Sequence, residues 1–431
     1  MQTTAQDLHA SRQEKFMKNI PEWLNHAVVA LIAVFVFVIP FHFNTAIQEI
    51  CFYTALFLAI SLHVFKKKPL TLQSPLTLSF GLFVFWAFIG LFFALNKENS
   101  IHDFYGHLLK NLVLFYLIVN FYRTKTSFLL IAWALVVSIS LFSLGLMIYF
   151  YVTLDHTLSD RLLSINIPTN IISVITIFPC MIAHNVFFRT KYLSIRIILV
   201  FCLFTIILSI IFTASRFSVS ILILSLILMS LCVTNKRGSL LLAIFIMLLI
   251  FCFPVKTRLV TNDFMNDVKN DPRFFLSNPF VEIIKTYPVA GIGFGMDSYA
   301  DKKILEKYNA KLAKKDRLDD QSLSAWYYPH NIYIDIATRV GFAGLLIFFY
   351  IVFSYFRTGW LIMKHSRDDF LRSWSFCLMI SFLALLVIGM FESFLGFSVS
   401  VVLYVQCAMM IVLWRIHSEF PLQIGDGTSP Q

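Results

Sequence analysis

The sequence predicts an all-α polytopic membrane protein. Of its 431 residues, 58% are hydrophobic and only 14% are charged, and the mean hydropathy is +0.77. Soluble domains carry about 25% charged residues, so this composition lies outside their range. The apolar residues also gather in runs of about 17–25, the length at which a helix spans about 30 Å of hydrocarbon.

About twelve such runs follow one another along the chain, and each is predicted to be a transmembrane helix because lipid leaves backbone groups no other partner. They lie at residues 24–41, 45–65, 75–95, 108–122, 127–152, 168–188, 197–214, 218–234, 240–254, 331–356, 374–391 and 398–415. Lys and Arg cluster in every second connection, as at residues 66–68, 189–196 and 357–372. The positive-inside rule therefore places these connections and both termini in the cytoplasm.

The order of segments follows from these helices. We expect a cytoplasmic segment at 1–23, transmembrane helices one to nine at 24–253, a periplasmic loop domain at 254–329, helices ten to twelve at 330–416, and a cytoplasmic tail at 417–431. The loop domain is rich in Lys and Arg, but long loops translocate largely regardless of charge.

Local signals predict that the loop domain is folded. Asn278 and Pro279 form a helix-start signal, and residues 298–317 have the pattern of a basic amphipathic helix. The glycine-rich run at 291–295 lacks the spacing of a nucleotide-binding loop, so we expect a tight turn there.

Charge and cysteine usage exclude several function classes. The net charge of +11 is divided among short clusters between apolar runs, which argues against nucleic acid as a partner. The seven cysteines lie in or beside apolar runs without a C-x-x-C pair, so we expect free packing thiols. Polar residues of two outer connections fit no metal-site spacing and are expected to be ordinary loop residues. They are His102, Asp103, His107, Asp155, His156, Asp160 and Arg161.

His330 is the first candidate site residue, because it stands on the outer side where the tenth helix begins. On a continuous helix, Ala337, Gly341 and Gly344 would share its face. Small residues there would allow a neighbouring helix to approach closely and fix the histidine. The spacing alone favours an ordinary interfacial histidine over a catalytic one.

A second face of this helix carries Asn331, Asp335 and Arg339. Asp335 and Arg339 are four residues apart in the favourable order for an ion pair. Arg339 would lie about 13 Å along the helix, so the pair should face a cavity or a partner rather than lipid. Whether the pair is structural or belongs to a site stays open at this point.

Two arginines are candidates for binding a phosphate or diphosphate. Arg216 lies where the seventh and eighth helices meet on the outer side with almost no loop between them. A guanidinium there can grip phosphate bidentately, although an arginine that only snorkels would look the same. Arg273 in the loop domain is a second candidate of this kind.

The pattern around His330 resembles the signature of the O-antigen ligases (WaaL type) in the O-antigen ligase/polymerase (Wzy_C) superfamily. It consists of His330-Asn331, nine residues, and then Gly341-x-x-Gly344. Arg273 followed by the P-x-x-G-x-G run within residues 287–293 is similar to a second superfamily pattern.

Arg216 matches an arginine that the superfamily places at an outer helix junction. Asn278 stands where many members have a Trp, a departure that concerns packing more than chemistry. The likeness covers the whole predicted topology.

This resemblance implies a GT-C-like transferase in the inner membrane of a Gram-negative bacterium, with a periplasmic active site. Such ligases move a finished glycan from undecaprenyl diphosphate to a sugar hydroxyl of lipid A-core, without a metal, ATP or another cofactor. It implies His330 as the general base, Arg216 and Arg273 as diphosphate ligands, and inversion at the anomeric carbon. Asn331, Asp335 and Arg339 are further candidates for substrate binding.

Two alternatives are kept. A repeat-unit polymerase uses the same donor and takes a glycan on a second lipid carrier as its acceptor. The chain length and the Gly341-x-x-Gly344 ending favour the ligase. A lipid-linked sugar flippase or other transporter should show inverted repeats or charges near the middle of several helices, whereas the candidate residues here gather at one membrane face.

Overall fold

The computed structural model describes residues 5–41, 45–66, 70–163, 169–230, 244, 276–295, 302–318, 323, 328–393, 395 and 400–419. Within them, eight helices are long and apolar enough to cross a membrane, and three shorter apolar helices accompany them. The chain is therefore a polytopic membrane protein. The predicted ninth span, 240–254, lies outside the described residues except for residue 244, and the whole loop segment 254–275 lies outside them as well.

The apolar helices follow the predicted runs closely. Their bounds are α1 Ala5–Val38, α2 Thr45–Lys66, α3 Thr77–Phe93, α4 Lys97–Asp103, η2 Phe104–Leu109, α5 Lys110–Phe121, α6 Lys125–Ile148, η3 Tyr149–Thr153, α7 Thr169–Arg189, α8 Leu193–Phe212, α9 Arg216–Ser230, α18 Ile332–His365, α19 Asp369–Ile388 and α20 Ser400–Glu419. The largest difference is at 97–121, where α4, η2 and α5 form one apolar helical stretch. His102, Asp103 and His107 therefore lie on helical turns and not in the loop that we expected.

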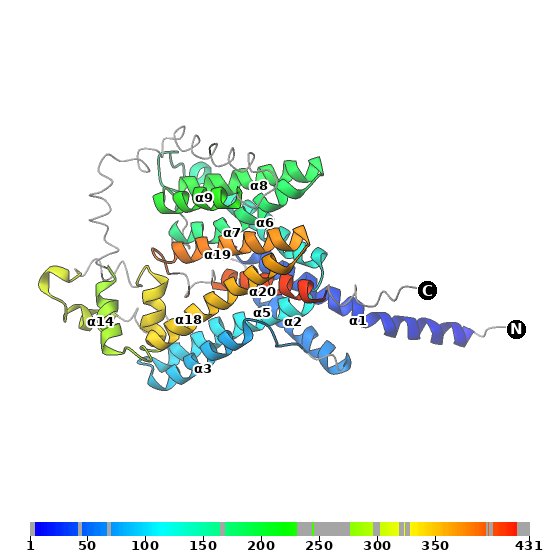
Figure 1. Ribbon diagram of the computed structural model, residues 1–431, viewed down its shortest axis with the longest axis horizontal. Coiled ribbons are helices and arrows are strands. Elements are labelled where there is room, and N and C mark those ends of the chain that lie inside the picture. The colour runs from blue at the N-terminus through cyan, green and yellow to red at the C-terminus, as the bar shows by residue number, and fades with distance from the viewer. Residues whose placement is uncertain are drawn as a thin grey trace.

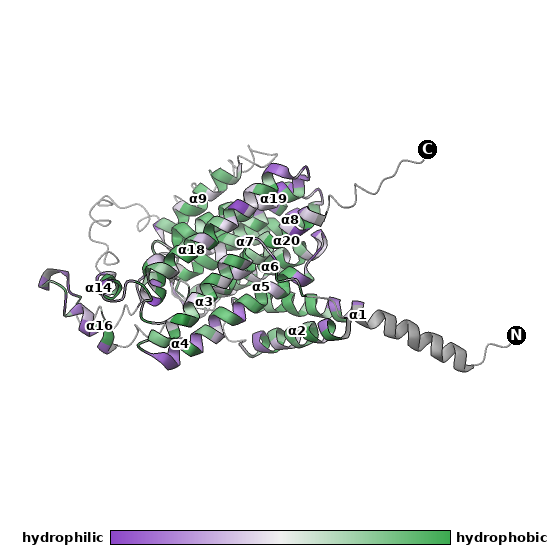
Figure 2. Cartoon of the chain, turned by 60° about the horizontal axis from the view of Figure 1, so that its bottom comes forward, coloured by the Kyte–Doolittle hydropathy of each residue, from purple (hydrophilic) through white to green (hydrophobic). Residues whose placement is uncertain are grey.

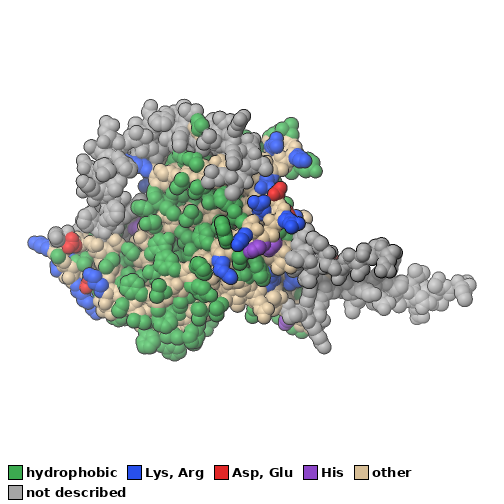
Figure 3. All heavy atoms as spheres, in the orientation of Figure 1, with side chains coloured by type: hydrophobic (Ala, Val, Ile, Leu, Met, Phe, Trp, Pro, Cys, Tyr) green, Lys and Arg blue, Asp and Glu red, His purple; other side chains and the backbone are tan. Residues whose placement is uncertain are grey.

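The helices form one bundle around α18, α19 and α20, which run through its middle (Figure 1). α18 packs against α3, α19 and α20, while α7 packs against α8 and α19. Hydropathy is high along the helices and low at their ends (Figure 2), and hydrophobic side chains cover the visible face of the bundle (Figure 3). Large hydrophobic side chains such as Ile50 and Phe57 are exposed, as expected of a surface that lipid covers.

The described part of the loop domain packs beside the first turns of α18, at one end of the bundle (Figure 1). The predicted helix start at Pro279 is confirmed by α14, Asn278–Thr286. Of the helix expected at 298–317, residues 298–301 lie outside the described part of the chain; α16 covers Lys302–Asn309 and so ends earlier than expected, and a single 3-10 turn, η4, covers Lys314–Asp316. A separate small core joins these elements, and it includes Phe280, Ile292, Leu305, Tyr308 and Tyr328.

α18 is interrupted at Gly341, where φ is 70° and ψ is −177°. We expected a continuous helix whose small residues admit a neighbouring helix, and this expectation is wrong at Gly341. A Cβ atom there would lie 2.0 Å from the carbonyl oxygen of Val289, so backbone of the loop domain fills the space. At Gly344 a Cβ would first meet Val340 of α18 itself, with Cγ2 at 2.2 Å, and Trp86 Cδ1 of the neighbouring helix α3 lies 3.3 Å away.

The interruption leaves backbone carbonyls of α18 without hydrogen-bond donors from the helix itself. Residues from elsewhere in the chain supply the missing donors. The amides of Ile292 and Gly293 donate to the carbonyls of Thr338 and Arg339, each at 3.0 Å. Trp86 Nε1 donates to the carbonyl of Val340 at 2.8 Å. A buried carbonyl without a donor costs about 1–3 kcal/mol, so these contacts make the break tolerable inside a membrane.

The glycine-rich run makes this contact possible. Gly291 has a φ of 68°, and a Cβ on it would lie 2.5 Å from the carbonyl carbon of Arg339. The amide of Phe342 donates to the carbonyl of Pro288 at 2.8 Å, and that of Leu95 donates to Ile292 at 2.9 Å. The predicted tight turn is therefore a backbone segment inserted between α18 and the end of α3.

The opposite end of the bundle is held by Arg415 near the end of α20. The side chain of Arg415 is buried. Nη1 donates to the carbonyl of Val119 at 2.6 Å, and Nη2 donates to that of Thr71 at 3.0 Å. Arg415 thus joins α20, the end of α5 and the segment after α2.

Substitution of Gly341 by Ala tests the packing at the break. We expect G341A to destabilise the protein by more than about 2 kcal/mol, because Ala is strained at positive φ and its Cβ meets the Val289 carbonyl. Thermal unfolding of the protein in detergent measures this loss. A Cβ added at Gly145 in α6 would have no neighbour within 4 Å, so G145A should not lower Tm. Equal Tm values for the two variants would contradict the account.

Substitution of Arg415 by Met tests the hydrogen bonds that this buried side chain donates to backbone carbonyls. R415M should lower stability by about 2–4 kcal/mol, because the carbonyls of Val119 and Thr71 lose a charged donor. The matched control is R372M, since Arg372 is an exposed arginine of α19. A thermal unfolding curve of R415M that coincides with that of R372M would show that the hydrogen bonds of Arg415 add nothing to the stability of the protein.

Candidate active site

His330 lies just before α18 and is buried, with 3% of its surface exposed. Its Nδ1 is 3.1 Å from Oε1 of Glu392, which is itself 1% exposed. The ring of Tyr328 lies against it, with 4.0 Å between ring centroids. His330 also has a φ of 35°, a conformation that a non-glycine residue keeps only when its surroundings determine it. The structure therefore holds this imidazole in one fixed place.

Glu392 is the functional candidate that sequence reasoning missed. It follows α19 by a few residues and lies 62 positions from His330, so no motif spacing joins the two. One signal was available: Glu392 is the only acidic residue between Asp369 and Glu419. A lone carboxylate between two apolar spans is costly unless it has a partner.

The segment that carries Glu392 is fastened to the start of α18 by backbone contacts. The amide of Ile332 donates to the carbonyl of Gly389 at 2.7 Å, and Asn331 Nδ2 donates to the carbonyl of Met390 at 3.0 Å. Asn331 Oδ1 accepts from the amides of Tyr333 and Ile334 and so caps the helix. The Asn331 amide thus positions the site, and its expected substrate contact stays a prediction.

Asp335 and Arg339 form the expected ion pair, with Arg339 Nε 2.9 Å from Asp335 Oδ1 and both side chains buried. Ser393 donates a hydrogen bond to the other Asp335 oxygen. The guanidinium of Arg339 lies over the ring of Phe294, with 5.5 Å to the centroid. The pair is therefore neutralised inside the protein, as a charge at this depth requires.

Arg216 is the first residue of α9, half-buried, at the same end of the bundle. The next residue, Phe217, packs on Phe391 with 4.0 Å between ring centroids. Phe391 directly precedes Glu392, so this contact brings the Arg216 junction beside the His330–Glu392 pair. Arg273, the other predicted phosphate ligand, lies outside the described residues.

The remaining polar candidates form small local groups. Asp103 is buried, and its Oδ1 lies 3.1 Å from His102 Nδ1 and 3.7 Å from His107 Nε2. Across the described ranges, no group of three or more His, Cys, Asp or Glu side chains is placed to hold a metal ion. The five cysteines that the structure describes are free and buried, as predicted.

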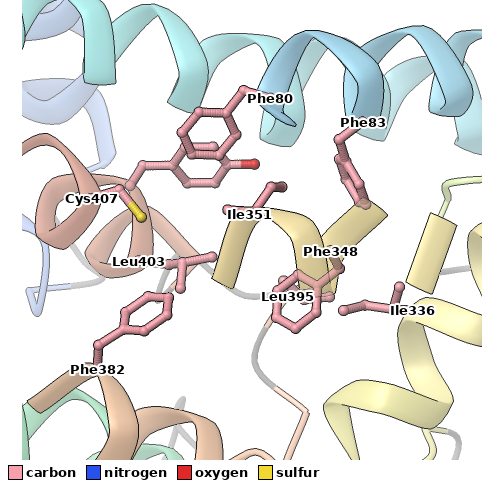
Figure 4. Close-up of a pocket in the computed structure, with 10 residues that line it drawn as sticks. Phe80, Phe83, Ile336, Phe348, Ile351, Phe382, Leu395, Leu403 and Cys407 are labelled. Atoms are coloured by element: carbon pink, nitrogen blue, oxygen red, sulfur yellow. The ribbon is translucent and has the colours of Figure 1, made fainter. Parts of the chain in front are cut away.

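A small apolar cavity lies between α3, α18, α19 and α20 (Figure 4). Its volume is about 30 Å³, and its lining includes Phe83, Ile336, Phe348, Leu395 and Leu403. A space of this size holds about one or two water molecules. This cavity is too small for a glycan.

Comparison with known proteins agrees with these features. Residues 200–349 match the sequence model of the Wzy_C family, described as O-antigen ligase. The matched segment begins in α8 and ends in the second half of α18, so it contains Arg216, Arg273, His330 and Gly341. A search of curated proteins gave no match. The chain is therefore a polytopic membrane protein whose residues 200–349 are similar to the Wzy_C O-antigen ligase family, the members of which are glycan-transferring enzymes.

Proposed function

We propose that this protein is an O-antigen ligase. It transfers an undecaprenyl-diphosphate-linked O-polysaccharide to a sugar hydroxyl of lipid A-core at the periplasmic face of the inner membrane. The observation that carries the proposal is the buried contact between His330 Nδ1 and Glu392 Oε1, 3.1 Å long. A histidine oriented by a carboxylate is the arrangement that a general base for a hydroxyl requires.

Glu392 fixes the proton of His330 on Nδ1, because an ionised carboxylate can only accept. The neutral ring then presents its lone pair at Nε2. This nitrogen takes the proton of the acceptor hydroxyl while the oxygen forms its bond to the anomeric carbon. The bond from that carbon to the diphosphate oxygen breaks on the opposite side, so the configuration inverts.

The leaving group of this reaction is undecaprenyl diphosphate, which gains negative charge in the transition state. Arg216 supplies a planar guanidinium at the N-terminal end of α9, where the helix itself also favours an anion. Stabilisation of a leaving diphosphate by fixed positive groups lowers the barrier without a proton transfer. The expected contribution of Arg273 is of the same kind.

Replacement of His330 tests the base. In cells that lack their own ligase, the wild-type chain should restore O-antigen ladders on lipopolysaccharide, and H330A should give none at equal expression. The matched control is H365A, because His365 is an exposed histidine at the other end of α18. Normal ladders from H330A would remove the proposed base.

A transfer assay with purified components separates the ligase from the polymerase, since the two differ in acceptor. Purified protein with labelled donor should transfer label to lipid A-core. Label that appears only on longer lipid-linked glycans would identify a repeat-unit polymerase instead. Transport of the donor without any new glycosidic bond would identify a flippase.

Replacement of Glu392 tests how the base is oriented. We expect E392Q to lower kcat by about 10–100-fold, as for other residues that orient a functional histidine. The KM for the donor should stay within about two-fold, because Gln keeps the shape and touches no substrate. E282Q is the control, since Glu282 pairs with Lys285 on the loop domain. A raised KM with an unchanged kcat would place Glu392 in substrate binding and refute the orienting role.

A further inference from the structure

Asp335 and Arg339 lie on the first turns of α18, close to the histidine site. Their side chains are buried, with 1% of Asp335 and 2% of Arg339 exposed. The two form an ion pair, with 2.9 Å between Arg339 Nε and Asp335 Oδ1. A buried ion pair costs desolvation that well-packed apolar residues would not. The pair therefore contributes little stability by itself, and its contacts point to another role.

The two oxygens of Asp335 have different partners. Oδ1 faces Arg339, whereas Oδ2 accepts a hydrogen bond from the hydroxyl of Ser393. Ser393 is 3% exposed and directly follows Glu392. Glu392 in turn places its Oε1 3.1 Å from His330 Nδ1. Two neighbouring residues after α19 are thus held by two residues at the start of α18.

The backbone that carries Glu392 lies past the end of α19. Between described residues, its hydrogen bonds end at Phe391, whose amide donates to the carbonyl of Ile388 at 2.9 Å. Glu392 and Ser393 follow that point and lie outside any helix. A side-chain contact from Ser393 limits the rotation of this segment, and so it limits the positions that the neighbouring carboxylate can take.

Arg339 is itself held by the loop domain. Its carbonyl accepts from the amide of Gly293 at 3.0 Å, and its guanidinium lies 5.5 Å from the ring centroid of Phe294. The residue that faces Asp335 is therefore fixed both at its backbone and at its charged group. A chain of contacts runs from the loop domain through Arg339 and Asp335 to the segment that carries Glu392.

We propose that Asp335 and Ser393 are positioning residues: their hydrogen bond holds Glu392 in the place from which it orients the histidine base. Arg339 fixes Asp335 for this task. The inference rests on the proposed function, because it concerns the same base. A misplacement of about 1 Å in a reacting group can cost about 100-fold in rate. The ion pair that the sequence suggested for substrate binding is thus assigned to the support of the base.

The test measures transfer of a labelled undecaprenyl-diphosphate-linked glycan to lipid A-core by the purified full-length protein. We expect S393A to lower kcat by about ten-fold, because Glu392 loses this second support. The KM for the donor should stay within about two-fold, since a positioning residue does not bind the donor. S393T keeps the hydroxyl and should restore kcat to within about two-fold of the wild-type value.

A double-mutant cycle separates positioning from a general contribution to the structure. If Ser393 acts through Glu392, loss of its hydroxyl adds nothing once Glu392 has been replaced. E392Q and the double variant E392Q/S393A should therefore have the same kcat within about two-fold. Independent effects would instead multiply in the double variant, as they do for separate sites.

The matched control is S373A. Ser373 is a buried serine at the other end of α19, and its hydroxyl donates to the carbonyl of Phe370 at 3.1 Å. Its replacement should leave kcat and KM unchanged. If S393A does not fold, D335E carries the same cycle, because Glu keeps a charge for Arg339 while it displaces the carboxylate from Ser393.

The outcomes keep this inference apart from the proposed function. A folded S393A with the wild-type kcat overturns the positioning role and leaves the proposed function intact, and effects that multiply in the double variant do the same. A raised KM with an unchanged kcat overturns the positioning role in favour of substrate binding. A wild-type protein that transfers no label to lipid A-core overturns the proposed function, and with it this inference.

Discussion

The site depends on how the freed carbonyls of α18 find donors. A helix that breaks inside a membrane exposes backbone groups to a medium without water, which costs several kcal/mol for each unpaired group. Here the amides of Ile292 and Gly293 and the indole of Trp86 supply the missing hydrogen bonds. The loop domain therefore stabilises α18 in the way that hydrogen bonds within the helix would. It also fixes where Arg339 stands relative to His330.

The second organising element is the short segment 389–393. It accepts from Ile332 and Asn331 through backbone carbonyls, and it supplies Glu392 to His330 and Ser393 to Asp335. Through Phe391 it also touches the α9 start at Phe217. One segment thus joins α9, α18 and α19 at the end of the bundle where the polar candidates gather.

Local patterns predicted much of this structure. Apolar runs located the helices, and an acid-first spacing of four predicted the Asp335–Arg339 pair that the structure contains. The break at Gly341 was not predicted, because a glycine in an apolar run looks like a packing residue until its partner is known. Glu392 was missed for a related reason. Its partner is 62 positions away, and only the folded chain brings a long-range pair together.

The first half of α18, residues 332–340, has a consequence for the order of assembly. A segment of this length is shorter than the roughly 12–15 residues that an isolated helix needs to persist. Its ends are held by the loop backbone on one side and by the segment after α19 on the other. Synthesis of the chain through α18 alone therefore does not complete the histidine site. The candidate site is therefore complete only late in biogenesis, when segments made before and after this helix have both packed against it.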